Sequence, residues 1–136
     1  MTLSGARAVH QSVAGDIVMV AGRGIQRSLN GGATFQPLAV DPDIVWNDVR
    51  VNGDGSAVAV GDDGAIANVD VTGTVSVQYV GDASLRTLHT HHNAVGYAAG
   101  DDGVVLITED VGKTWRLGPN VGRTVLGVDE VGFGHR

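Results

Sequence analysis

The chain contains no cysteine, and aromatic residues make up only 4% of its 136 residues. Without cysteine it forms no disulfide and offers no thiolate to a metal ion, which favours a reducing compartment such as the cytoplasm. No apolar run reaches the roughly 18 residues that a membrane-spanning helix needs. The first residues also lack the basic and then apolar order of a secretory signal. We therefore expect no membrane insertion, and the localisation stays open.

Basic residues are scarce as well. Lysine and arginine number 9 against 15 acidic residues, which gives a formal charge of −6. The basic residues are scattered, and a nucleic-acid-binding surface needs them clustered, so we expect no nucleic-acid partner. Glycine is abundant, with 21 residues, and many of the apolar residues are valine or alanine. This composition favours short β-strands joined by turns over long helices.

Two sequence markers recur along the chain. The first is a glycine that opens a polar turn, and it returns every 39 residues, at Gly22, Gly61 and Gly100. The second is a polar segment that returns every 40 residues, starting at Ser28, Asn68 and Thr108. A period of about 40 residues is typical of repeat architectures, in which one unit cannot bury its own apolar face.

The second copy shows the organisation of one unit. Residues 45–51 alternate apolar and polar side chains and predict a strand, and residues 52–55 predict a turn. Strands are expected at 56–60 and 65–69, joined by a tight Asp-Gly hairpin whose residues tolerate positive φ. Residues 75–80 supply a fourth strand. Four antiparallel strands in about 40 residues make up one blade of a β-propeller.

We therefore predict an all-β repeat domain over residues 1–136. It holds about three complete β-propeller blades and one further strand, at about 7–40, 45–80, 85–118 and 121–136. A β-sandwich and a β-solenoid are the competing folds, but neither explains both the period and the strand count. Closed propellers have about four to eight blades, so we expect oligomerisation, with a dimer favoured, or missing blades on another chain, to complete the ring.

The second marker resembles the Asp-box, or bacterial neuraminidase repeat, whose pattern is Ser/Thr-x-Asp-x-Gly-x-Thr-Trp. The third copy matches every defined position, with Thr108, Asp110, Gly112, Thr114 and Trp115. The first copy keeps Ser28, Gly32 and Thr34, with Asn30 and Phe35 at the other two positions. The second copy keeps Asp70 and Thr74.

Together with the preceding Gly-Asp-Asp-Gly turn, these motifs resemble the propeller of the photosystem II assembly and stability factors. The resemblance implies a structural role for the marker residues, in which short polar side chains bond nearby backbone groups and the aromatic residue packs beneath the turn. It also implies a non-enzymatic scaffold that binds a protein partner or assembles with itself.

Several residues are candidates for ligand binding. Trp46 is either a stacking platform or an inter-blade filler. Arg50 and Arg86, with Arg7, fall in successive first strands, where they either line a central anion site or remain solvated.

A short histidine run holds the other ligand-binding candidates, since His89 and His91 share one face of a predicted strand. Two imidazoles with no third ligand do not define a metal site, so we predict no metal and no cofactor. Calcium at the two Gly-Asp-Asp-Gly turns is a weaker alternative to plain hairpin turns.

Two other functions follow from the same resemblance. A lectin-like propeller would bind carbohydrate in equivalent pockets, but few aromatic rings are available to stack on sugars. A sialidase-like glycosidase would need a tyrosine and carboxylates, and the chain offers Tyr79, Tyr97, Glu109 and Glu130 without a clear acid/base pair. We expect no enzymatic activity and no catalytic residue.

Overall fold

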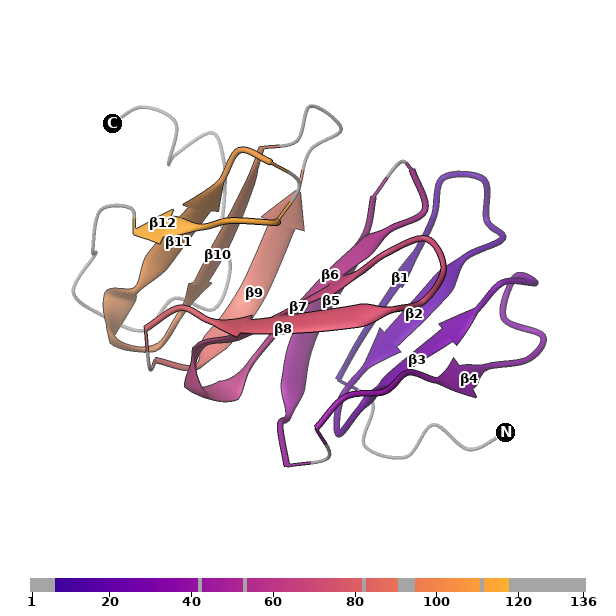
Figure 1. Ribbon diagram of the computed structural model, residues 1–136, viewed down its shortest axis with the longest axis horizontal. Coiled ribbons are helices and arrows are strands. Elements are labelled where there is room, and N and C mark those ends of the chain that lie inside the picture. The colour runs from indigo at the N-terminus through magenta and orange to yellow at the C-terminus, as the bar shows by residue number, and fades with distance from the viewer. Residues whose placement is uncertain are drawn as a thin grey trace.

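The computed structural model describes residues 7–41, 43–52, 54–81, 83–90, 95–110 and 112–117. These residues form three four-stranded antiparallel sheets that lie side by side (Figure 1). The first sheet contains β1 (Ala8–Gln11), β2 (Val18–Ala21), β3 (Ile25–Ser28) and β4 (Gln36–Pro37). The second contains β5 (Trp46–Val51), β6 (Ala57–Gly61), β7 (Ala65–Val69) and β8 (Val75–Tyr79). The third contains β9 (Leu85–Thr90), β10 (Gly96–Gly100), β11 (Val105–Thr108) and β12 (Arg116–Leu117).

Each sheet is a simple meander in which neighbouring strands in the chain pair with one another. The first strands of successive sheets, β1, β5 and β9, contact each other, while β4, β8 and β12 end their sheets on the other side. This is the arrangement of propeller blades around an axis, so the fold is an all-β set of propeller blades. The expected strand within 121–136 lies outside the described residues. No helix in the described part of the chain has the length and apolar character to cross a membrane.

The middle sheet explains how the blades pack. Successive side chains of a strand point to opposite faces, so β6 and β7 bury both faces. One face presents small residues to the first sheet, namely Ala57, Ala59, Ala65 and Ala67. The opposite face presents Val58, Val60 and Ile66 to the third sheet, where Leu88 and Leu106 are fully buried. Two apolar layers, one on each side of the middle blade, hold the three blades together.

The marker glycines hold matching places. Gly22 directly follows β2, while Gly61 and Gly100 are the last residues of β6 and β10. At Gly61 an added Cβ would lie 2.5 Å from the Val45 carbonyl oxygen, and at Gly100 it would collide with the Ser84 carbonyl oxygen. In both blades glycine is needed because the chain that enters the first strand passes directly over it.

The two Asp-Asp-Gly turns depart slightly from the predicted tight hairpin. Each forms a three-residue 3-10 turn, η1 (Asp62–Gly64) and η2 (Asp101–Gly103). The prediction of positive φ is confirmed at Asp63 (φ 59°) and Gly64 (φ 77°), and the Ala65 N–H donates to the Asp62 carbonyl oxygen. The local chemistry of Asp-Gly therefore turns the chain, but over one residue more than a two-residue loop.

Candidate functional site

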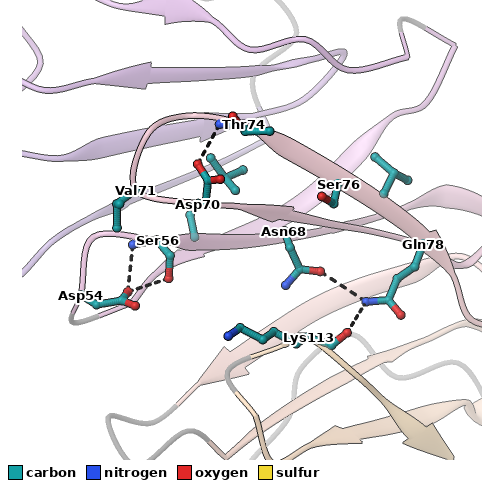
Figure 2. Close-up of a pocket in the computed structure, with 12 residues that line it drawn as sticks. Asp54, Ser56, Asn68, Asp70, Val71, Thr74, Ser76, Gln78 and Lys113 are labelled. Carbon is teal, nitrogen blue, oxygen red and sulfur yellow. Dashed lines mark hydrogen bonds between the residues drawn. The ribbon is translucent and has the colours of Figure 1, made fainter.

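The described residues form a groove of about 660 Å³ along the outer part of the second blade, beside the third. Eight of its twelve lining residues are polar or charged, and they come from both blades: Asp54, Ser56, Asn68, Asp70, Thr74, Ser76, Gln78 and Lys113. Its apolar lining residues are Ala57, Val69, Val71 and Val77. In Figure 2, Asp54 and Ser56 lie at one end and Gln78 at the other, with Lys113 facing them from the third blade.

Two turn carboxylates line this groove. Asp54 Oδ1 accepts hydrogen bonds from the Ser56 N–H (2.9 Å) and hydroxyl (2.6 Å). Asp70 Oδ1 accepts from Thr72 and from the Thr74 N–H (2.9 Å). The hydroxyl hydrogen bonds from Ser56 and Thr72 lower the pKa of Asp54 and Asp70 respectively. Both carboxylates are therefore ionised at neutral pH, and among the described residues no hydrogen bond engages their Oδ2 atoms.

An amide network fixes the wall of the groove between the two blades. Asn68 Nδ2 donates to the Gly112 carbonyl oxygen (2.7 Å). Gln78 Nε2 donates to Asn68 Oδ1 (3.3 Å) and to the Lys113 carbonyl oxygen (2.9 Å), as Figure 2 shows. These bonds join the outer strands of the second blade to the marker turn of the third. These contacts fix the side chains of Asn68 and Gln78 at the wall of the groove.

A similar hydrogen bond from a side chain to the next blade's marker turn joins the first blade to the second. The Arg27 guanidinium donates to the carbonyl oxygens of Val71 (3.3 Å) and Thr72 (3.4 Å) in the second marker turn. In both cases a third-strand side chain reaches the next blade's turn. The sequence does not reveal this inter-blade hydrogen bond, because its donor is arginine in the first blade and asparagine in the second. Only the pairing register shows that Arg27 and Asn68 occupy corresponding positions.

The third marker turn is closed by its own side chains. Thr108 Oγ1 accepts from the Gly112 N–H (2.9 Å) and donates to Asp110 Oδ1 (2.8 Å). Asp110 in turn accepts from the Thr114 N–H (2.8 Å) and hydroxyl (2.5 Å). The hydroxyl bond from Thr114 is the main reason that the pKa of Asp110 falls to about 2. Trp115 Nε1 donates to the Gly112 carbonyl oxygen (2.9 Å), and the ring packs against the apolar layer between the blades.

The first marker turn has the same geometry with different atoms. Ser28 Oγ accepts from the Gly32 N–H (2.8 Å) and donates to Asn30 Oδ1 (2.8 Å). Asn30 accepts from the Thr34 N–H (3.0 Å) and donates through Nδ2 to the Thr34 hydroxyl (2.8 Å). Phe35 is half-buried at the position that corresponds to Trp115. In the second turn only the Asp70 and Thr74 part of this pattern is present.

The register corrects the predicted arginine ring. Met19, Val58 and Tyr97, 39 residues apart, pair with His10, Arg50 and His89 on β1, β5 and β9. Arg50 therefore corresponds to two histidines and not to Arg86. Arg50 and Arg86 lie 36 residues apart, whereas corresponding positions lie 39 apart, and β5 and β9 carry a bulge at the same place.

Arg86 instead corresponds to Asn47. Arg86 forms a two-pronged ion pair with Asp101 (3.0 and 3.1 Å), and Asn47 Nδ2 donates to Asp62 (3.0 Å). Each contact ties the start of the first strand to the turn after the second. The hydrogen bond from Arg86 lowers the pKa of Asp101. Asp62 and Asp101, candidates for calcium from the sequence, are thus each paired within their own blade.

Near the axis, polar groups join successive first strands. Asp48 Oδ2 accepts from the Leu88 N–H (2.8 Å) of the third blade, and its Oδ1 pairs with Arg50 (2.9 Å). His10 Nδ1 accepts from the Val51 N–H (2.8 Å) of the second blade. Partial burial and the nearby Arg50 charge lower the pKa of His10, so its ring is neutral at neutral pH. Arg50 therefore belongs to an inter-blade network.

The structure corrects the interpretation of Trp46 as a platform on which a ligand stacks. Its side chain is fully buried in the layer between the first two blades, beside Met19 and Ile25. No face of the ring is open to a ligand, and the alternative of an inter-blade filler describes its place. Its Nε1 has no hydrogen-bond partner among the described residues.

The remaining candidates do not come together as a site. His89 lies on β9 opposite Tyr97, while His91 lies outside the described residues. Within the described ranges, no group of three or more His, Cys, Asp or Glu side chains could hold a metal ion. Tyr79 and Tyr97 belong to different blades, Glu109 is an exposed partner of Arg116 at 3.9 Å, and Glu130 lies outside the described residues.

Comparison with known proteins bears on the fold. No family model matches the chain, and no curated protein matches it. Among solved structures, YCF48 bound to D1 peptide superposes with a TM-score of 0.72 at 18% identity, covering 90% of this chain and 44% of YCF48. YCF48 from Cyanidioschyzon merolae gives 0.70 at 16% identity, covering 85% of this chain and 40% of that one.

A GH74 enzyme from Niastella koreensis gives a TM-score of 0.68 at 15% identity, covering 90% of this chain and 19% of the enzyme. These proteins are β-propellers, and the likeness identifies the fold of this chain as a β-propeller. The predicted resemblance to photosystem II assembly factors therefore holds at the level of fold. The chain spans less than half the length of these structures.

Proposed function

We propose that this chain is part of a β-propeller scaffold that binds a protein partner and catalyses no reaction. The observation that carries the proposal is the groove of about 660 Å³, whose polar lining comes from two blades. Fixed polar groups beside exposed apolar ones are what a protein-binding surface needs for orientation and contact.

The hydrogen bonds of the aspartate carboxylates support this proposal. Asp54, Asp70, Asp101 and Asp110 each accept hydrogen bonds that close a turn or tie a strand to a turn. A general acid or base needs a carboxyl group free to exchange a proton with substrate near neutral pH. Carboxylates with lowered pKa values, held by local donors, suit a structural role instead.

Two of the structurally similar proteins also agree with a binding role. One is YCF48 bound to D1 peptide, and another is a chain of the mitotic checkpoint complex, which matches with a TM-score of 0.66. At 18% identity neither assigns a partner to this chain. Each is a propeller solved together with polypeptide partners, and that is the use we propose here.

We further propose that the ring is completed by other blades, either from a second copy or from another chain. Val20, Ala59 and Ala98, 39 residues apart, pair with Val9, Val49 and Leu88 on the first strands. Val49 and Leu88 are fully buried against the preceding blade, whereas Val9 is 64% exposed. An apolar side chain at this position is suited to a preceding blade that the described residues do not include.

Selection of peptides from a phage-displayed random library against the purified chain tests the binding role. Ser76→Arg fills the groove, and Gln36→Arg makes the same kind of change on β4, in the outer strand of the first blade. We expect enriched peptides to bind the wild type and Gln36→Arg equally, and Ser76→Arg about tenfold more weakly. Equal binding to all three proteins, or no enriched peptide, would contradict the proposal.

Two further assays of the purified chain test the lectin-like and glycosidase alternatives. Binding on a glycan array that is lost in Ser76→Arg would favour a lectin-like propeller. Hydrolysis of a fluorogenic sialoside that is abolished by Tyr97→Phe would favour a glycosidase. We expect neither result.

A further inference from the structure

The outer edge of the second blade differs from the outer edges of the other two. Strand β8 is five residues long, while β4 and β12 have two residues each. We propose that the free edge of β8 pairs, in antiparallel orientation, with an extended segment of a partner protein in which apolar and basic residues alternate. This inference rests on the proposed binding function and names the surface and the chemistry of the partner.

The hydrogen-bond pattern of β8 shows which of its backbone groups face outward. Gly64 accepts from the Val80 N–H (2.9 Å), and the Asp70 N–H donates to Thr74 (3.0 Å). Hydrogen-bonded pairs alternate along an antiparallel ladder, so Gln78 and Ser76 bond to Ile66 and Asn68 on β7. The N–H and C=O groups of Val75, Val77 and Tyr79 therefore point away from β7. Among the described strands β8 has no neighbour on that side.

This edge lacks the features that normally protect an edge strand. Such strands are usually very short, or carry proline, charge or a bulge that prevents pairing. Strand β4 is short and contains Pro37, and β12 is short and contains Arg116. The β8 sequence Val-Ser-Val-Gln-Tyr has no proline and no charge, and it pairs with β7 without a register shift. Its open row of donors and acceptors fits another extended backbone.

The two faces beside the edge specify the partner's side chains. Val77 is 39% exposed and Tyr79 is 59% exposed, and both lie on one face of the strand. Ser76 and Gln78 lie on the other face, beside Asn68 and Lys113, and they line the groove together with Val77. In an antiparallel pair, directly opposite residues share a face. Partner residues opposite Val75, Val77 and Tyr79 should therefore be apolar, and the residues between them should face the groove.

Charge in the groove selects basic residues at these intervening positions. Asp54 and Asp70 both line the groove, and their Oδ2 atoms accept no hydrogen bond from the described residues. Lys113 is the one ammonium group among the groove's lining residues, against these two carboxylates. A lysine or arginine that enters from the partner would complement the excess negative charge.

A short synthetic peptide provides a direct probe. The acetylated and amidated heptapeptide Lys-Val-Lys-Val-Lys-Val-Lys places its three valines opposite Val75, Val77 and Tyr79. A peptide of the same composition in the order Lys-Lys-Val-Val-Val-Lys-Lys controls for charge attraction alone. We expect the alternating peptide to bind about tenfold more tightly by fluorescence anisotropy than the scrambled one. Equal binding would overturn the proposal.

Backbone methylation tests the pairing itself. Methylating the nitrogens of the three valines removes the donors that face β8, whereas methylating the two lysines between them removes donors that face solvent. The first change should weaken binding about tenfold or more and the second by less than about twofold. If both changes act alike, antiparallel pairing with β8 is wrong.

Two variants of the chain complete the test. Val77→Pro removes an N–H that β7 does not use and that the peptide requires, and Val77→Thr keeps the N–H. Circular dichroism and melting temperature establish that both variants fold. We expect Val77→Pro to lose the peptide and Val77→Thr to keep it. Should Val77→Pro not fold, the methylated peptides alone decide.

The test also separates this inference from the binding function and from a second copy. Library peptides that bind Val77→Pro as well as wild type would leave the binding function standing and overturn pairing at β8. A fall in assembly mass on Val77→Pro, with no peptide bound to wild type, would mean that a second copy occupies the edge, and this too would overturn the proposal.

Discussion

At the residue scale, Asp110 is the side chain that most clearly stabilises a marker turn. Its folded pKa of about 2 lies below its ordinary value of 3.8, chiefly because the Thr114 hydroxyl donates to it. A carboxyl group with a depressed folded pKa stabilises the fold fully above about pH 4. The contribution is lost as pH falls towards the folded pKa.

Asp110→Asn should remove this acid sensitivity at little cost at neutral pH. In the first blade Asn30 already accepts from the Thr34 N–H and donates to the Thr34 hydroxyl. Urea unfolding at pH 7 should therefore place the variant within about 1 kcal/mol of wild type. Between about pH 4 and pH 2 wild type should lose stability relative to the variant. Parallel pH dependence of the two proteins would contradict this role.

The glycines at the ends of β6 and β10 allow a second prediction. A Cβ at Gly61 or Gly100 would meet backbone carbonyl oxygens of Val45 and Ser84, which cannot move without shifting a strand. Gly61→Ala and Gly100→Ala should each lower the free energy of unfolding by roughly 2–4 kcal/mol. Gly24→Ala is the matched control, because nothing lies within 4 Å of its Cβ position. Equal effects at the three sites in urea unfolding would show that the close approach is not real.

At the scale of elements, His10 joins β1 to β5. Its Nδ1 accepts from the Val51 N–H and can do so only while the ring is neutral at that atom. Burial, assisted by the Arg50 charge and opposed by Asp48, lowers the pKa of His10 below 6.5. Its contribution to stability is therefore complete above about pH 6.5 and declines as pH falls through the lowered folded pKa.

His10→Gln keeps an acceptor that does not titrate. The melting temperature of wild type should fall more than that of the variant between about pH 7.5 and 5.5. His89 lies at the corresponding place on β9 and is the same residue in both proteins, so the comparison isolates His10. A variant whose melting temperature follows wild type over this range would rule out the inter-blade role.

The sequence predicts the elements well because the information there is local. The second copy was expected to have strands at 45–51, 56–60, 65–69 and 75–80, and the structure has β5 to β8 within one residue of these bounds. Alternating apolar residues and Asp-Gly turns act over only a few neighbours. The bonds between blades are different. Asp48 reaches the Leu88 N–H 40 residues away, and the pairing register of the first strands decides which side chains align.

The candidate site is harder to predict from the sequence, because its residues come together only through contacts between distant parts of the chain. Residue type alone points to Arg50 and Trp46 as ligand-binding candidates, yet Arg50 forms an ion pair with Asp48 within β5 and Trp46 is fully buried. The groove residues Ser76 and Gln78 carry no sequence motif, and Asn68 stands out in the sequence only as the start of the second marker segment. Their role follows only from the edge position of β8 and from the approach of Lys113 from the next blade.

At the scale of the whole molecule, the central claim is that these blades need others beside them. Val9 corresponds to two buried residues of the later blades but is itself 64% exposed. Val9→Arg should weaken any contact with a preceding blade, because a charge there would be buried without a partner. The variant should leave the three blades themselves folded, since Val9 points away from the second blade.

Sedimentation equilibrium of the purified chain tests this claim most directly. We expect wild type to associate, with twice the 14.0 kDa mass of one chain as the smallest closed assembly, and Val9→Arg to shift the population towards 14.0 kDa. A wild-type chain that stays at 14.0 kDa over the whole accessible concentration range would contradict the claim.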